Sequence, residues 1–151
     1  RDLPLVFAVH PRTRRKPDVF DLLAKLSQPT KGGTRITLTE PLGYIQFMNL
    51  VCSARAVITD SGGVQEESTY LGIPCLTLRE NTERPITAEQ GTNTIVGRDP
   101  AKIRACVAGI LQNGGKAGRV PEYWDGKAAE RIAAAIAQWL GVGSASAEHQ
   151  P

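Results

Sequence analysis

A short apolar run that ends in Thr-Asp-Ser-Gly-Gly and continues into a helix-compatible segment constrains the fold of this chain most. The stretch covers residues 57–67 and predicts a strand, a tight turn and the start of a helix. Such a corner directs free backbone N–H groups and the positive end of a helix dipole toward an anion. Gly62 and Gly63 would let a phosphate approach the backbone with no Cβ in the way. Ser61 could either cap the helix or donate its hydroxyl to a phosphate oxygen.

Glu67 adds a second feature to this stretch. It follows Gly63 by four residues, so the two share one helix face and are separated by one turn, roughly 5–6 Å. A carboxylate only accepts hydrogen bonds, and a ribose diol offers two donors. The stretch therefore suggests a nucleoside diphosphate, with its phosphates at residues 61–63 and its ribose at Glu67. The alternative is a purely structural corner with a capping serine, because glycine-rich corners are common in α/β domains.

The composition is that of one ordinary globular domain. The 151 residues are 41% hydrophobic and 22% charged, which is enough for a real core. The net charge of +3 is too small to indicate nucleic acid or a membrane surface as a partner. One dense basic cluster, Arg12 with residues 14–16, is interpreted as a solvated loop or as a phosphate-steering patch. No signal peptide and no apolar run of membrane-spanning length is found, which favours the cytoplasm.

The three cysteines, Cys52, Cys75 and Cys106, are far apart and show no metal-ligand spacing. No metal site is therefore expected. Each cysteine lies in an apolar segment, so we predict that all three are small buried residues in a reducing compartment.

Strand-like and helix-like segments alternate along the chain. Apolar runs predict strands at residues 3–9, 35–38, 56–59, 74–78 and 93–96. The first of these is expected to be buried on both faces. Helical periodicity predicts helices at residues 17–26, 44–51, 64–71, 86–89, 99–113 and 127–140. We therefore predict an α/β fold, a Rossmann-like parallel sheet with helices on both faces, over residues 1–140, followed by a disordered tail over residues 141–151.

Several side chains near the ends of the predicted strands are further candidates, because α/β ligand sites lie at that edge. His10 could contact a phosphate or a sugar, or it could bond a backbone carbonyl. Leu42 and Phe47 could form a stacking surface for a base, or they could pack in the core. Arg79 or Arg84 could neutralise a diphosphate by bidentate contact, or they could form surface ion pairs with neighbouring glutamates.

Three segments taken together resemble a known family. They are Asp-Ser-Gly-Gly-Val-Gln-Glu-Glu at 60–67, Leu-Gly-Ile-Pro at 71–74 and Arg-Glu-Asn-Thr-Glu-Arg-Pro at 79–85. They closely resemble the C-terminal domain of the non-hydrolysing UDP-N-acetylglucosamine 2-epimerases. Residues 10–13, 40–44 and 91–93 also look like family segments, in the right order. The resemblance covers nearly the whole chain up to its tail. It implies the C-terminal half of a GT-B-like fold, in which two Rossmann-like domains enclose the active site.

The resemblance also implies roles for individual residues, because the family's C-terminal domain holds UDP. Carried over by motif, the Leu42 backbone and Phe47 would meet the uracil, and Glu67 the ribose hydroxyls. The diphosphate would lie on Ser61, Gly62, Gly63 and Arg84. His10 and Arg79 remain possible additional contacts.

The family reaction, as the resemblance implies it, inverts C2 of the sugar reversibly. UDP-GlcNAc and UDP-ManNAc interconvert by elimination of UDP to a glycal and its re-addition, with no NAD, other cofactor or metal. This domain would stabilise the departing UDP. The family's acidic catalytic residues lie in an N-terminal domain that this chain lacks, so we expect the chain alone to be inactive. A homodimer is expected for the full-length protein.

The first strand–helix unit of the C-terminal domain is also expected to be missing, which would expose one sheet edge or face. Two other functions stay open. The donor-binding half of a GT-B glycosyltransferase would share the phosphate corner and the ribose glutamate, but Glu-Arg-Pro at 83–85 favours the epimerase. A non-enzymatic nucleotide-binding module is disfavoured by the abrupt start without Met. A dinucleotide-binding dehydrogenase is disfavoured because no Gly-x-Gly-x-x-Gly motif follows the first strand.

Overall fold

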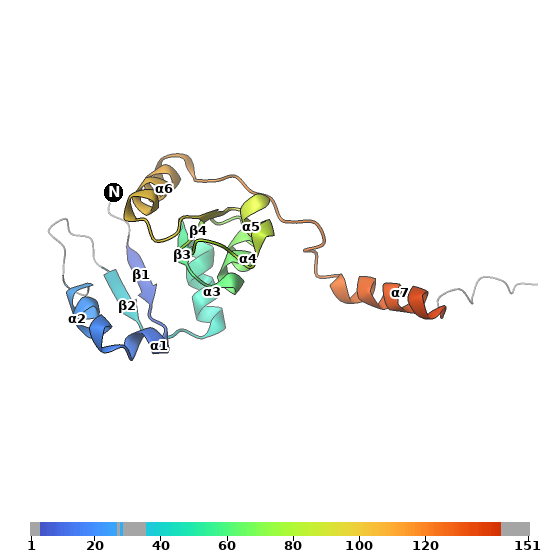
Figure 1. Cartoon of the computed structure of the whole chain (residues 1–151), viewed down its shortest axis with the longest axis horizontal. Coiled ribbons are helices and arrows are strands. Elements are labelled where there is room, and N and C mark those ends of the chain that lie inside the picture. The colour runs from blue at the N-terminus through green and yellow to red at the C-terminus, as the bar shows by residue number, and fades with distance from the viewer. Residues whose placement is uncertain (1–3, 27, 29–35, 143–151) are drawn as a thin grey trace, which may run out of the picture. The chain divides into compact units, whose positions relative to one another are not determined.

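A computed structural model of the chain describes residues 4–26, 28 and 36–142. The chain forms two compact units, Arg1–Leu50 and Val51–Pro151, and each is described here by itself (Figure 1). Most of the tail predicted over residues 141–151 lies outside the described residues.

The first unit is built on a parallel strand pair. Strand β1 (Leu5–Ala8) pairs with β2 (Ile36–Thr39), with Leu5 opposite Ile36. Two helices lie between them in the sequence, α1 (Pro11–Arg14) and α2 (Pro17–Leu26). A crossover of this kind is what two parallel strands require. Helix α3 (Tyr44–Ser53) follows β2 and ends in the second unit.

The burial predicted for the first strand is wrong. Leu5, Val6 and Phe7 remain 44%, 45% and 38% exposed, and full burial begins only at Val9, past the end of the strand. A continuous apolar run such as this one normally belongs to a strand that is buried on both faces. The described residues therefore pack against only part of the surface of β1.

The second unit contains three parallel strands in the order β3-β4-β5. These are β3 (Val57–Thr59), β4 (Cys75–Thr77) and β5 (Asn93–Ile95). Helix α4 (Gly62–Tyr70) joins the first two, and α5 (Pro85–Glu89) joins the last two. Helices α6 (Pro100–Asn113) and α7 (Ala128–Leu140) follow. The parallel sheets with helices on both faces confirm the predicted fold class, although the strands pair as two sheets where one was expected.

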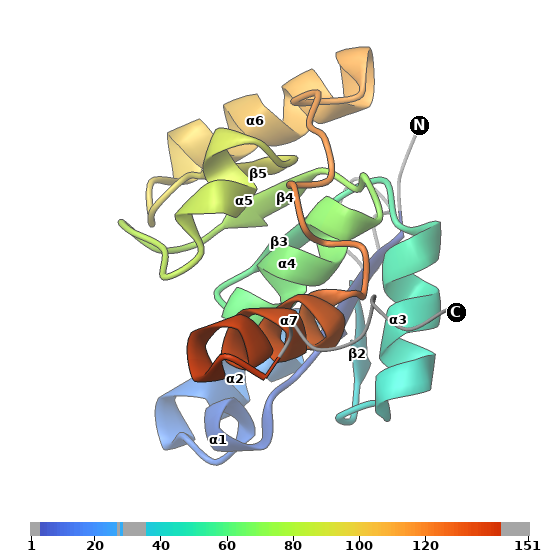
Figure 2. The same cartoon turned by 90° about the vertical axis from the view of Figure 1, so that its right-hand side faces the viewer.

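The two faces of the central strand β4 have different surroundings. Leu76 packs with Val96 and Ile110 of α6 to form the hydrophobic core. Its neighbours Cys75 and Thr77 point to the opposite face, since side chains alternate along a strand. Figure 2 shows α6 and α4 on opposite sides of these strands. The strand register places Asn93 on this same face, together with the apolar residues Val57 and Ile95, so the face toward α4 is partly polar.

The predicted burial of all three cysteines is wrong for two of them. Cys75 is buried, and this burial raises the pKa of its thiol above the ordinary value. Cys52 is exposed and Cys106 is partly exposed. Cys52 lies one residue after Val51, which is buried, and one residue is about 100° of rotation around a helix. An apolar segment does not show which of its side chains face the core.

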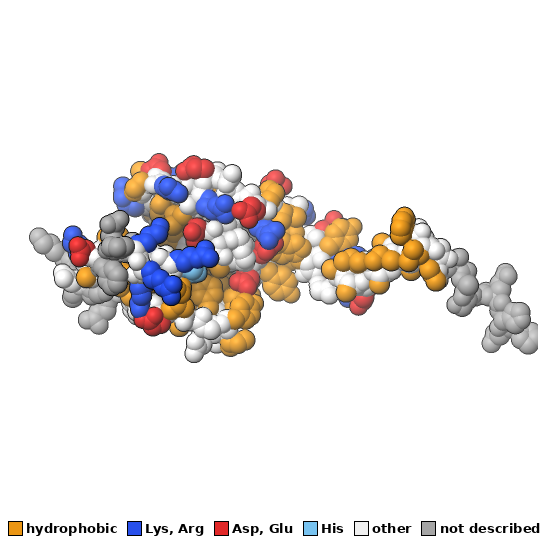
Figure 3. Space-filling view, turned by 60° about the horizontal axis from the view of Figure 1, so that its bottom comes forward, with side chains coloured by type: hydrophobic (Ala, Val, Ile, Leu, Met, Phe, Trp, Pro, Cys, Tyr) orange, Lys and Arg blue, Asp and Glu red, His pale blue; other side chains and the backbone are white. Residues whose placement is uncertain are grey.

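Helix α7 forms as predicted, but its apolar face is exposed. Trp139 is 85% exposed, and the other apolar residues of that face are also exposed: Ile132, Ile136 and Leu140. Figure 3 shows hydrophobic side chains in a row along this helix. The described residues do not cover a face that the amphipathic pattern would place against a core.

Candidate functional site

The corner between β3 and α4 has the predicted strand–turn–helix geometry. Ser61 is the N-cap residue of α4, with φ −83° and ψ 127°, and its side chain makes no capping hydrogen bond. Its backbone N–H donates to Thr59 Oγ1 at 3.1 Å. The first intrahelical bond of α4 runs from the N–H of Gln65 to the carbonyl of Ser61. The N–H groups of residues 62–64 therefore have no intrahelical acceptor and can bind an anion.

Neither glycine of the corner is required by the fold itself. Gly62 and Gly63 do not adopt positive φ. A Cβ built on Gly63 meets no described atom within 4 Å, and one built on Gly62 meets the Arg84 side chain at an ordinary 3.8 Å. A purely structural corner would tolerate alanine at both positions. The space at the Gly63 Cβ position is open, and the Arg84 side chain borders the Gly62 position.

Arg84 lies directly beside this corner. Its Cγ and Nε atoms are the atoms closest to the Gly62 position, and its Nε lies 3.2 Å from Glu66 Oε1. The guanidinium side chain is 48% exposed, so it can still reach a ligand. Arg84 precedes α5 in the segment that follows β4. The structure thus brings Arg84 and the glycine corner together, as expected for two segments at the carboxyl edge of one parallel sheet.

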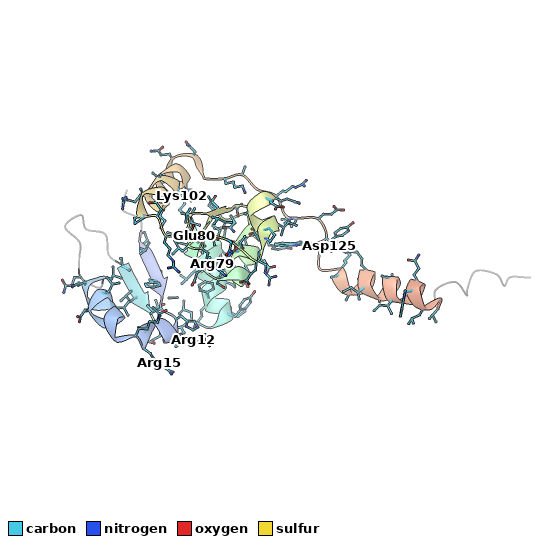
Figure 4. The ribbon with its side chains drawn as sticks, in the orientation of Figure 1. Arg12, Arg15, Arg79, Glu80, Lys102 and Asp125 are labelled. Carbon is cyan, nitrogen blue, oxygen red and sulfur yellow. The ribbon has the colours of Figure 1, made fainter. Side chains whose placement is uncertain are left out.

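Two other charged side chains at this edge, Arg79 and Lys102, have protein partners. Arg79 Nη2 forms a surface ion pair with Glu83 Oε1 at 3.1 Å, which was the alternative considered for Arg79. The carboxylate of Glu80 approaches Gly97, where a Cβ would lie 2.7 Å from Oε1. Lys102 donates from Nζ to the carbonyl of Ile95 at 2.9 Å. Figure 4 labels Arg79, Glu80 and Lys102.

Glu67 lies on α4, one turn after Gly63, and is partly buried. Within the described part of the chain its carboxylate has no ion pair or hydrogen bond, whereas the neighbouring Glu66 is paired with Arg84. The two adjacent glutamates therefore differ: one orients an arginine, and the other is available as an acceptor.

The candidates of the first unit are placed as follows. His10 is exposed, and its Nδ1 accepts a hydrogen bond from the N–H of Arg12 at 3.2 Å, capping α1. This differs from the expected bond to a carbonyl, because the ring nitrogen accepts here. Leu42 and Phe47 are partly exposed at the start of α3, where the Phe47 N–H donates to the carbonyl of Gly43. His10, Leu42 and Phe47 all belong to the first unit.

The basic cluster of the first unit is partly paired. Arg14 forms an ion pair with Glu40. Arg12, Arg15 and Lys16 are exposed, and Figure 4 labels the first two near α1. The solvated-loop interpretation is confirmed only in part, because most of the cluster is exposed but Arg12 and Arg14 lie in helix α1 and not in a loop.

A buried polar network under the corner was missed by sequence reasoning. Gln65, Thr77, Thr87 and Asn93 are 0–1% exposed and are joined by side-chain hydrogen bonds, with Thr82 at the edge of the group. Polar residues at helix positions 65, 68 and 69 normally indicate a solvent-exposed face. The sequence therefore carries no local signal for this burial.

A cavity of about 240 Å³ lies elsewhere in the second unit. Its lining includes Pro74, Cys75 and Thr92, which are at the amino ends of β4 and β5, and Cys106 of α6. The glycine corner follows the carboxyl end of β3. Ser61 and Gly63 of the corner are exposed, and neither lines this cavity. In the described residues no three His, Cys, Asp or Glu side chains gather as metal ligands. A search of the same residues finds no helix long and apolar enough to cross a membrane.

Parallel strands flanked by helices, with an open glycine corner and an arginine at their carboxyl edge, place the chain among the Rossmann-like α/β domains. The chain belongs to the UDP-N-acetylglucosamine 2-epimerase family, whose model matches residues 1–137. This match confirms the family that the motifs predicted.

Two curated relatives are longer than this chain. The chain is 42% identical over 131 residues to the UDP-N-acetylglucosamine 2-epimerase of Methanocaldococcus jannaschii, covering 87% of this chain and 34% of that protein. It is 44% identical over 109 residues to the enzyme of Methanococcus maripaludis, covering 72% and 29%. The chain spans about a third of the length of these curated relatives.

Two solved structures show the same fold with a nucleotide present. The M. jannaschii UDP-GlcNAc 2-epimerase in complex with UDP-GlcNAc and UDP matches with a TM-score of 0.74 at 39% identity, covering 91% of this chain and 36% of that one. The S. aureus MnaA–UDP structure matches with a TM-score of 0.72 at 29% identity, covering 99% and 39%. These GT-B-like neighbours agree with the predicted fold class.

Proposed function

We propose that this chain is the UDP-binding domain of an epimerase that interconverts UDP-GlcNAc and UDP-ManNAc. The observation that carries the proposal is the open corner at residues 61–63 with the Arg84 side chain beside it. Two further findings support it. The chain belongs to the epimerase family, and two of its structural neighbours were solved with UDP. The family match favours the epimerase over a glycosyltransferase.

The diphosphate is the part of UDP that the corner would hold. The free N–H groups at the start of α4 and the positive end of its dipole attract the negative oxygens. The Ser61 hydroxyl, which caps nothing, would donate one more hydrogen bond. The Arg84 guanidinium would add a charge-assisted contact. Its pair with Glu66 is partly exposed, and such pairs contribute at most about 1 kcal/mol, so a phosphate could compete for it.

The nucleoside would be held by residues outside the corner. Glu67 would accept hydrogen bonds from the ribose hydroxyls, one helical turn from Gly63. The Leu42 backbone and the Phe47 ring would contact the uracil, as the family motif suggests. His10 and Arg79 remain possible additional contacts.

In the proposed reaction, UDP leaves C1 of the sugar as a glycal forms, and then adds back. Donors fixed in place before the C1–O bond breaks stabilise the charge that develops on UDP. The acidic catalytic groups are proposed to lie in an N-terminal domain outside this chain. A homodimeric, cytoplasmic enzyme of polysaccharide biosynthesis is part of the same proposal, and it would use neither a cofactor nor a metal.

Titration of the chain with UDP tests this function, by calorimetry and by NMR of the ¹⁵N-labelled chain, with ADP as control. We expect saturable binding that prefers UDP over ADP, with shifts at residues 61–67. UMP should bind more weakly, because it offers one phosphate to the corner and to Arg84. Equal affinity for UDP and ADP, or no saturation at millimolar UDP, would overturn the proposal.

A further inference from the structure

A chain of hydrogen bonds connects the core of the second unit to the backbone of Arg84. Thr82 Oγ1 accepts a hydrogen bond from the Arg84 N–H at 3.0 Å and donates to Gln65 Oε1 at 2.5 Å. On the other side, Thr87 Oγ1 donates to the Arg84 carbonyl at 2.7 Å. Asn93 links the two threonine branches, because its Nδ2 donates both to Thr87 Oγ1 at 3.0 Å and to Gln65 Oε1 at 3.2 Å.

The direction of each of these bonds is fixed by the Arg84 backbone. Each threonine hydroxyl has one proton to donate. Thr87 gives its proton to the Arg84 carbonyl, so Asn93 must present its NH₂ group to Thr87. Thr77 supports this orientation by donating to Asn93 Oδ1 at 2.7 Å. The NH₂ group of Asn93 then requires an acceptor at Gln65, so the Gln65 oxygen faces inward.

The arrangement leaves one buried group without a partner. Gln65 is fully buried, and its Nε2 has no hydrogen-bond partner among the described residues. A buried donor without a partner is unfavourable, and an apolar side chain of similar size would avoid it. What the glutamine supplies instead is an oxygen that holds Thr82 and Asn93 together. Its contribution therefore lies in fixing the segment that carries Arg84.

Gln65 also links the network to the glycine corner. It follows Gly63 by two residues on α4, and its N–H makes the first intrahelical bond of that helix, to the Ser61 carbonyl. The same residue therefore belongs to the helix that presents the free N–H groups and to the network that holds Arg84. Glu66, the next residue, reaches the Arg84 guanidinium from the helix surface.

We propose that Gln65, Thr82 and Asn93 are positioning residues that fix Arg84 over the glycine corner, so that its guanidinium is set for a diphosphate before the ligand arrives. The inference rests on the proposed UDP site. Thr82 is the critical member, because its hydroxyl joins Gln65 Oε1 to the Arg84 N–H and no other described group does so directly. A contact fixed in advance has little conformational freedom to lose on binding.

Substitution of Thr82 tests this role in a double-mutant cycle with Arg84. Thr82→Val keeps the shape and removes the hydroxyl, and Thr82→Ser restores it. We expect Thr82→Val to weaken UDP binding about three- to tenfold, the range for one lost hydrogen bond. Binding of uridine should not change, since uridine has no phosphate. In an Arg84→Ala background the same substitution should have no further effect. Thr94→Val, in β5 and outside the network, is the matched control.

Hydrogen exchange at the Arg84 amide gives a readout without ligand. Exchange should become faster in Thr82→Val and return to the original rate in Thr82→Ser, which also excludes general unfolding as the cause. The inference is overturned if Thr82→Val leaves UDP affinity unchanged, or if it lowers the affinity for uridine as much as the affinity for UDP. It is also overturned if Thr82→Val still lowers UDP affinity in the Arg84→Ala background. If the unsubstituted chain does not bind UDP, the proposed function fails and this inference fails with it, and that result is distinct from the other three.

Discussion

Gly63 offers the most direct distinction between a structural corner and a ligand site. Its φ is not positive, and a Cβ there would meet no described atom within 4 Å. Gly63→Ala should therefore leave the free energy of unfolding unchanged or raise it by up to about 1 kcal/mol, because alanine is the better helix former. The new methyl group would stand where the phosphate approaches the backbone. We expect UDP affinity to fall at least about tenfold, measured by calorimetry beside chemical denaturation.

The matched control for this substitution is Gly109→Ala on α6. Gly109 also has open space around its Cβ position and no positive φ. Its replacement should stabilise the chain in the same way and leave UDP affinity unchanged. Equal UDP affinities in Gly63→Ala and the unsubstituted chain would favour the purely structural corner.

At the scale of single residues, the sequence best predicted the positions of residues that are close together both in the chain and in space. Ser61, Gly62, Gly63 and Glu67 lie on one turn and one helix, so local patterns placed them correctly. Arg84 required one topological rule, that the carboxyl ends of parallel strands share an edge. The buried contacts of Gln65 follow from neither, because they depend on side chains 17 and 28 residues away.

At the scale of the element, helix α4 would set the distance between the proposed phosphate and ribose contacts. Glu67 lies one turn beyond Gly63, and its carboxylate has no partner in the described part of the chain. Glu67→Ala should weaken UDP binding by about 1–3 kcal/mol, the range for hydrogen bonds to a charged group. The loss should be smaller with 2′-deoxy-UDP, which lacks one of the two ribose donors.

Glu130→Ala, in the first turn of α7, is the control for removing a helical carboxylate. This substitution should change neither the affinity for UDP nor the affinity for 2′-deoxy-UDP. The ribose role of Glu67 is excluded if Glu67→Ala binds UDP as tightly as the unsubstituted chain, or if UDP and the deoxy ligand lose affinity equally.

The bounds of the elements were easier to predict than their burial. Helix α6 begins after Asp99, whose Oδ1 accepts from the Ala101 N–H, and it ends at Gly114 with φ 83°. These capping signals are local and appear in the sequence. The exposure of Phe7 in β1 and of Cys52 in α3 depends on which other segments cover them. Periodicity identifies an apolar face but does not show which segment packs against it.

At the scale of the whole molecule, two elements leave their apolar side chains exposed. Strand β1 and helix α7 expose large hydrophobic residues in this chain, and the chain spans about a third of each curated relative. A covered strand and an amphipathic helix are normally packed on their apolar sides. In the described residues, neither face has the packing that its apolar pattern predicts.

The chain should therefore bind UDP without catalysing epimerisation. With the acidic groups proposed to lie in another domain, no group would remove the C2 proton, and a held leaving group alone does not break the C1–O bond. Incubation with UDP-GlcNAc in ²H₂O, followed by NMR, should show no deuterium at C2 and no UDP-ManNAc. The M. jannaschii epimerase, 42% identical over the matched region, is the positive control in the same buffer. Deuterium at C2 with this chain alone would show that these 151 residues contain the proton-transfer groups, and the partition of roles between two domains would then be wrong.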